Sequence, residues 1–224
     1  DHRDLHSFPT RRSSDLVGRA IALELHAAGA CVMLHYRSAA AEAEALVAEL
    51  NALRPDSAAC AHADLLDTAK LLQLVETTIA QFGRLDALVN NASSFFPTPL
   101  GSIDEAAWVD LIGTNLKAPL FLTQAAAPAL RAARGAVVNI TDIHAERPLA
   151  GYPLYCAAKA GLLGLTRALA IELAPQVRVN AVAPGPVLWP DDELFDSAAR
   201  REIVAHTLLG REGQPQEKIG RAHV

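Results

Sequence analysis

Residues 136–159 read AVVNITDIHAERPLAGYPLYCAAK and contain the pattern that decides the fold. Their first six residues are a short, β-branched apolar run of the length expected for a buried strand. A polar turn follows, and residues 154–174 then place apolar side chains at helical spacing. A buried strand followed directly by a helix is the repeating unit of a parallel α/β sheet.

The same alternation extends outward through the chain. On the expected helix 39–53, Leu46, Val47, Leu50 and Leu53 should face inward, and Gly29 should end the helix before it. Right-handed crossovers place helices on both faces of such a sheet. The predicted fold class is therefore α/β, a doubly wound Rossmann-type parallel sheet in one domain. Helices are expected at 17–28, 39–53, 69–82, 104–133 and 154–174, and strands at 30–35, 59–63, 85–90, 136–141 and 177–182.

Composition excludes several classes of protein. Of 224 residues, 51% are hydrophobic and 20% charged, which is globular, and a net charge of −5 predicts no nucleic-acid partner. The three cysteines, Cys31, Cys60 and Cys156, lack CxxC spacing, which disfavours a disulfide framework and a metal site and favours the cytoplasm. No apolar run reaches the roughly 18 residues of a membrane span.

Tyr155 and Lys159 are candidates for proton transfer. Residues four apart on a helix share one face, so the ammonium can lie near the phenol. A cation there would favour phenolate and lower the pKa of Tyr155. The alternative is an ordinary solvated pair, but the strand 136–141 ends just before it, where parallel sheets bind ligands.

Three further motifs accompany this pair. They are NNA at 90–92, N-x-x-x-A-P from Asn115, and VNAVAPGPV at 179–187. Each asparagine alone could equally cap a turn. Together, in this order and spacing, the motifs resemble the short-chain dehydrogenase/reductase family from about residue 17 to 217.

The resemblance implies a set of roles. Tyr155 would donate a proton, Lys159 would hold the nicotinamide ribose, and Asn115 would support a proton-relay water. Asp64 and Leu65 would contact adenine. The remaining residues implied to touch the cofactor are Gly18, Asn91, Ala92, Pro184 and Gly185.

One position departs from the family pattern. Most members have a serine thirteen residues before the tyrosine to hydrogen-bond a substrate carbonyl, and here that residue is Asp142. An ionised carboxylate cannot donate to a carbonyl, but it accepts well from the ring N–H and amino groups of a pterin. Asp142 could also carry a proton to a ring nitrogen alongside Tyr155, and the alternative is that it merely caps the following turn.

The segment after NNA agrees with a flat substrate. It reads SSFFPTPL, and with Asp142 it resembles the pteridine reductase branch of the family. That resemblance implies that Phe95 stacks on the pterin and that Ser93 contacts both pterin and cofactor. Phe96 is expected in the core. Trp189 either closes the pocket or anchors its loop.

Cofactor choice depends on the end of the second expected strand. Arg37 and Ser38 stand there in place of the acidic residue that would bind a ribose 2′-OH. A guanidinium with a hydroxyl suits a 2′-phosphate, so NADPH is the predicted cofactor.

The two ends of the chain do not follow the pattern. Residues 1–16 and 218–224 resemble translated sequencing adapters and are interpreted as non-native tails on a single domain at 17–217. By resemblance, the family's first and last strands and its first two fingerprint glycines are missing. We therefore expect this polypeptide to bind NADPH poorly and to be largely inactive, and the intact protein to be a homotetramer.

These observations leave three hypotheses. The first is an NADPH-dependent pteridine reductase acting on a dihydropterin or dihydrofolate. The second is a short-chain reductase of a carbonyl such as a 3-oxoacyl thioester. The third is a non-catalytic nucleotide-binding regulator on the same fold.

Overall fold

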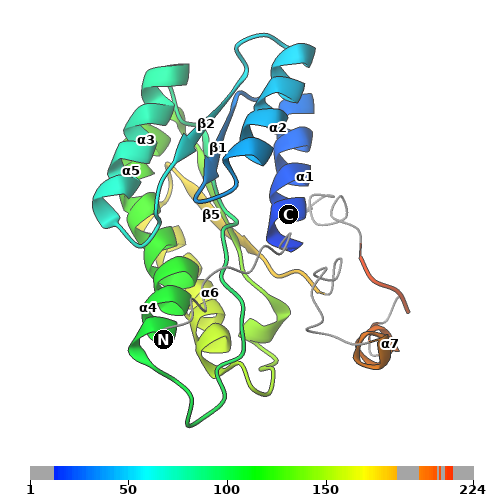
Figure 1. Cartoon of the computed structure of the whole chain (residues 1–224). Coiled ribbons are helices and arrows are strands. Elements are labelled where there is room, and N and C mark those ends of the chain that lie inside the picture. The colour runs from blue at the N-terminus through cyan, green and yellow to red at the C-terminus, as the bar shows by residue number, and fades with distance from the viewer. Residues whose placement is uncertain (1–12, 186–196, 206, 208–209, 214–224) are drawn as a thin grey trace, which may run out of the picture.

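The computed structural model describes residues 13–185, 197–205, 207 and 210–213, and shows an alternation of helices and strands (Figure 1). Trp189 and most of both predicted tails lie outside these residues. The elements in chain order are α1 (Ser13–Ala27), β1 (Val32–Tyr36), α2 (Ala40–Leu53), β2 (Ala58–His62), α3 (Thr68–Phe82), β3 (Ala87–Asn90), α4 (Glu105–Ile112), the π-helix η1 (Gly113–Lys117), α5 (Ala118–Ala133), β4 (Ala136–Ile140), the 3₁₀ helix η2 (Ile143–Ala145), α6 (Pro153–Leu173), β5 (Arg178–Val182) and α7 (Ser197–Ala205).

All strand pairs are parallel, which confirms the α/β Rossmann-type prediction. Within the described residues the strands form two groups, β1–β2 and β3–β4–β5, and not one continuous sheet. Backbone pairing is therefore interrupted between β1 and β3. Each of these strands keeps one edge without a strand partner in the described part of the chain.

Each group of strands has its own apolar core. The larger core joins β3, β4 and β5 to α3, α5 and the end of α6, and the smaller one joins β1 and β2 to α1 and α2. Figure 1 shows these helix pairs on opposite sides of the molecule. The largest side chains that are fully buried in the described residues include Leu50, Leu71, Leu111, Leu130, Leu162 and Val137.

Two predictions about helices need correction. The expected helix 104–133 is divided by η1, where the backbone N–H of Ala118 bonds to the carbonyl of Gly113, five residues back. Leu53, expected inside, is 73% exposed because it lies in the last turn of α2, beyond the edge of the smaller core. The stop at Gly29 is confirmed by its positive φ of 98°.

Helix α6 is the one described helix that is long and apolar enough to cross a membrane by length and composition. Such a test also selects core helices of α/β proteins. Here α6 packs on β5, η2 and the α4–η1 region, and it buries both Tyr155 and Lys159. Its apolar character is thus accounted for by packing within the fold.

A close backbone approach at Gly135 yields a test of the larger core. An ideal Cβ on Gly135 would lie 2.3 Å from the carbonyl oxygen of Asp86, which already accepts the N–H of Ala136. We predict that Gly135→Ala lowers the free energy of unfolding by about 2–3 kcal/mol, because a backbone carbonyl cannot move aside cheaply.

The matched control is Gly164→Ala in the middle of α6, where nothing lies within 4 Å of the added carbon. This change should be neutral or should stabilise the protein by up to about 1 kcal/mol through helix propensity. Urea unfolding followed by circular dichroism measures both. Equal destabilisation by the two substitutions would contradict the close packing of Gly135 against the carbonyl of Asp86.

Candidate active site

The carboxyl ends of β3 and β4 bring the predicted catalytic residues together. These strands pair in register, with Asn90 opposite Asn139. The chain leaving β3 carries Ser93 and Phe95, and the chain leaving β4 carries Asp142. Helix α6 packs against both η1 and η2, so its Tyr155 meets side chains from both loops.

The central contact is between Tyr155 and Asp142. The Tyr155 hydroxyl donates to Asp142 Oδ2 at 2.7 Å, while Asp142 Oδ1 accepts the backbone N–H of His144 at 2.9 Å and caps η2. Asp142 therefore both caps its turn and faces the tyrosine. The carboxylate is held from two sides at the position where relatives of the predicted family have a serine.

The predicted direction of the Tyr155 pKa was wrong. Burial, and after it the charge and hydrogen bond of Asp142, raise the pKa of Tyr155 above its ordinary value. Lys159 is buried, donates from Nζ to the carbonyl of Ile140 at 3.0 Å, and lies 5.7 Å from the centroid of the Tyr155 ring. The phenol consequently keeps its proton, despite the nearby lysine.

Asn115 is fixed by the π-helix. It is completely buried, and its Nδ2 donates to the carbonyls of Ser94 and Leu111, both at 2.9 Å. Its Oδ1 accepts from Ser93 Oγ at 2.6 Å, and Ser93 acts on the pKa of Tyr155 in the opposite direction to Asp142, lowering it. The Asn115–Ser93 pair and the Tyr155–Asp142 pair are thus two side-chain hydrogen bonds of this part of the site. Single-turn π-bulges within α-helices are frequently found at functional sites.

A buried chain of hydrogen-bonded side chains was missed by the sequence analysis. Asn90 Nδ2 donates to Asn139 Oδ1 at 2.7 Å, and Asn139 Nδ2 donates to Thr166 Oγ1 at 2.8 Å. These side chains join β3, β4 and α6 below the site. An asparagine inside each of two apolar strands, LVN and AVVNI, was the available signal, because a buried amide needs partners.

The aromatic residues form one cluster. Phe95 stacks on Tyr152 at 4.6 Å between centroids with planes 10° apart, and it meets Tyr155 edge-on at 4.7 Å. Phe96 packs against the same buried cluster, as expected. Tyr152 was missed, although its place one helical turn before Tyr155 puts both rings on one side of α6.

A cavity of about 360 Å³ adjoins Asp142. Its lining includes Thr141, Ile143, Glu146 and Arg147 from the loop after β4, with Leu163 of α6 and two alanines at the end of β5. The segment after β5 passes beside it, because the N–H of Ile143 donates to the carbonyl of Pro184 at 3.2 Å. Gly185 follows, exposed.

The predicted adenosine-binding residues lie at the other group of strands. Arg37 and Ser38 are exposed directly after β1, and the N-cap of α2, Ala39, offers no side chain to the first helical N–H groups. Asp64 follows β2 and accepts the N–H of Leu66 at 3.0 Å, and Leu65 is buried. Polar groups that could hold a dinucleotide therefore follow both β1 and β2.

Gly18 and Asn91 lie close together where the β1–β2 part of the molecule meets the β3–β4–β5 part. An ideal Cβ on Gly18 would lie 3.1 Å from Asn91 Nδ2, so α1 approaches the end of β3 closely. Ala92 is exposed beside it. The described residues contain no group of three or more His, Cys, Asp or Glu side chains that could hold a metal ion.

Parallel strands, with a buried tyrosine and lysine one helical turn apart on the helix that packs beside their carboxyl ends, are typical of a Rossmann-type oxidoreductase with a nicotinamide cofactor. The sequence model of the family described as enoyl-(acyl carrier protein) reductase matches residues 13–224. The chain belongs to the short-chain dehydrogenase/reductase family.

Three relatives show the range of similarity. Pteridine reductase 1 of Leishmania tarentolae is 40% identical over 218 residues, covering 80% of this chain and 75% of that protein. The 3-oxoacyl-[acyl-carrier-protein] reductase FabG of Staphylococcus aureus is 36% identical over 200 residues, covering 88% and 81%. A 3-oxoacyl-[acyl-carrier-protein] reductase of Synechocystis is 34% identical over 206 residues, covering 91% and 82%.

The electrostatic coupling of Asp142 and Tyr155 generates a prediction. Asp142→Asn removes the negative charge that opposes phenolate, so the pKa of Tyr155 should fall towards its ordinary value. NMR of ¹³C-labelled tyrosine as a function of pH measures this. The control is Asp104→Asn at the N-cap of α4, which should leave the Tyr155 titration unchanged. An unmoved Tyr155 titration in Asp142→Asn would contradict the coupling.

Proposed function

We propose that the protein is an NADPH-dependent pteridine reductase, which reduces the ring of a dihydropterin or a dihydrofolate. The observation that carries the proposal is the hydrogen bond from Tyr155 to Asp142. It places an ionisable acceptor and a proton donor side by side at the end of β4. A nitrogen-rich ring offers both kinds of partner, whereas a ketone offers only an acceptor.

In the proposed reaction, Tyr155 donates a proton and Asp142 accepts hydrogen bonds from the substrate. Bound NADPH would supply the hydride. Tyr155, whose pKa is raised, remains protonated near neutral pH and holds a proton ready for a ring nitrogen. Asp142 keeps a lone pair on each oxygen to accept from ring N–H or amino groups. Lys159, 5.7 Å from the Tyr155 ring, would offset the charge left on the phenolate.

Phe95 is proposed as one wall of the substrate pocket. Tyr152 stacks on one of its faces and Tyr155 touches it edge-on, so its orientation is fixed. A ring held in this way can stack on a flat heterocycle at little cost in side-chain entropy. Ser93 would contact substrate and cofactor from the same loop, and Trp189 would contribute to the pocket from outside the described residues.

NADPH is favoured over NADH by Arg37 and Ser38. The loop joining β1 to α2 consists of Arg37, Ser38 and Ala39 and contains no carboxylate. A guanidinium, a hydroxyl and the N–H groups of a helix start match the needs of a 2′-phosphate. Asp64 and Leu65 would contact the adenine.

A 3-oxoacyl reductase is the second candidate, because relatives of that name align over more than four fifths of this chain. Asp142 argues against it, since an ionised carboxylate cannot donate to a carbonyl. A regulator without activity is disfavoured by the burial of both Lys159 and Asn115 in contact with the loops of the site.

The interruption between β1 and β3 supports a further part of the proposal. No described strand pairs with both β1 and β3, and a strand at that place with a glycine-rich turn after it would cradle the pyrophosphate. We propose that the 224-residue chain itself binds NADPH poorly and is largely inactive, and that the active protein is a cytoplasmic tetramer.

A substrate panel tests the proposed reaction. NADPH oxidation would be followed with a dihydropterin, dihydrofolate and a 3-oxoacyl thioester, using this chain and a form extended by a glycine-rich strand. We predict turnover of the dihydropterin or dihydrofolate by the extended form only. Asp142→Ser in that form should lower the rate by at least about 100-fold, or about 2.7 kcal/mol. Preferential turnover of the thioester would overturn the proposal.

Phe95 provides a second test. Phe95→Leu keeps an apolar side chain but removes the stacking face, so KM for the dihydropterin should rise about five- to tenfold. Phe96→Leu is the matched control, because Phe96 packs against the same cluster without a ring stack among the described residues. Steady-state kinetics of the extended form measure both. A similar rise in KM for the two variants would remove the assigned role of Phe95.

A further inference from the structure

A histidine with no role so far lies beside the predicted phosphate-binding loop. His62, the last residue of β2, is the register partner of Tyr36, the last residue of β1. Their rings are 5.6 Å apart between centroids and tilted by 55°. Because partners in parallel strands project to the same face, His62 and Tyr36 extend together from the strand ends towards the start of α2.

The His62 side chain is exposed, and Arg37 directly follows its register partner Tyr36. His35 precedes Tyr36 on β1, and both His62 and Arg37 act electrostatically on it. His35 itself is half-buried and bonds to the carbonyl of Ala63 at 2.9 Å. Burial, with smaller contributions from His62 and Arg37, lowers the pKa of His35, so His35 stays neutral.

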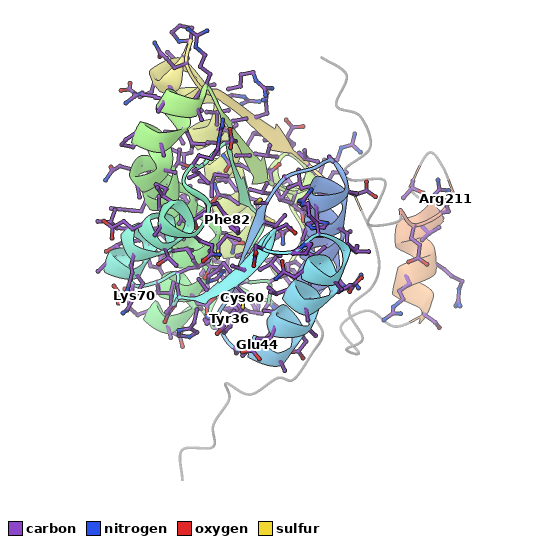
Figure 2. All side chains as sticks on the ribbon, turned by 90° about the horizontal axis from the view of Figure 1, so that it is seen from above. Tyr36, Glu44, Cys60, Lys70, Phe82 and Arg211 are labelled. Atoms are coloured by element: carbon purple, nitrogen blue, oxygen red, sulfur yellow. The ribbon has the colours of Figure 1, made fainter. Side chains whose placement is uncertain are left out.

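The other ionisable groups here do not neutralise His62 by direct contact. Asp64 is engaged by the N–H of Leu66, and no ion pair to His62 occurs among the described residues. Cys60, two residues earlier on β2, has a pKa raised by burial and then by Glu44 of α2, so its thiol stays neutral. Figure 2 shows Tyr36, Cys60 and Glu44 near one another in this region.

We propose that His62 is a third recognition group for the 2′-phosphate of NADPH, acting with Arg37 and Ser38. This inference rests on the proposed use of NADPH. Two cationic groups from neighbouring strands would then flank the phosphate, and Tyr36 would hold the imidazole in place. A histidine side chain can carry a positive charge beside a phosphate, so we expect the contribution of His62 to be larger at lower pH.

The test measures binding, not turnover. The probe is 2′,5′-ADP, which carries the 2′-phosphate, and 5′-AMP is the reference without it; calorimetry gives both dissociation constants. His62→Gln should weaken binding of 2′,5′-ADP about tenfold near pH 6 and less than about twofold near pH 8. Binding of 5′-AMP should be unchanged. Variant and wild type are compared at the same pH, because the phosphate also titrates near pH 6.

Two further variants make the experiment specific. His62→Arg places a permanent cation at the same site and should restore tight binding at both pH values. Arg131→Gln removes an exposed cation from the last turn of α5, far along the chain from the strand ends, and should leave binding of both nucleotides unchanged.

The outcomes are separable. Equal weakening by His62→Gln at both pH values, or equal weakening of 5′-AMP, would overturn the role of His62. Failure of the wild type to prefer 2′,5′-ADP over 5′-AMP would overturn both this role and the proposed use of NADPH. A pH-dependent effect of His62 in a protein that reduces no pterin would uphold the inference and refute only the proposed substrate.

Discussion

The parallel pairing of β3, β4 and β5 is the constraint on which the site depends. Parallel strands end at the same edge, so side chains far apart in sequence arrive together without a dedicated linker. The buried chain from Asn90 through Asn139 to Thr166 adds side-chain bonds to this pairing and ties α6 to it. Since Tyr155 and Lys159 lie on α6, the position of the reacting groups follows from the strands below them.

Within that frame, electrostatics decides what the site can do. Burial and the half-buried carboxylate of Asp142 raise the pKa of Tyr155. The nearby Lys159 donates its hydrogen bond to a backbone carbonyl. A serine in place of Asp142 would leave the tyrosine without this opposing charge. The site therefore presents a carboxylate acceptor at a position where a serine could also donate a hydrogen bond.

Much of the fold was predictable because the strands are short apolar runs and the helices have clear boundaries. Gly29 and the start of α2 illustrate this. The π-helix at Asn115 was not predictable from periodicity. A single backbone hydrogen bond to the carbonyl five residues back leaves the apolar pattern of the helix nearly unchanged. The pKa direction of Tyr155 failed for a similar reason: residue spacing places Lys159 near the ring, but burial and the carboxylate contribute more.

The division into two groups of strands has a consequence for ligand binding. The residues proposed to bind adenosine follow β1 and β2, whereas the residues proposed to act on the substrate ring follow β3 and β4, and no described strand joins the two groups of strands. The approach of Gly18 to Asn91 is a contact at the boundary. A dinucleotide that engaged both ends would therefore also hold the two halves together, and its binding energy would appear partly as stability of the fold. In such a protein, cofactor affinity and resistance to unfolding rise and fall together.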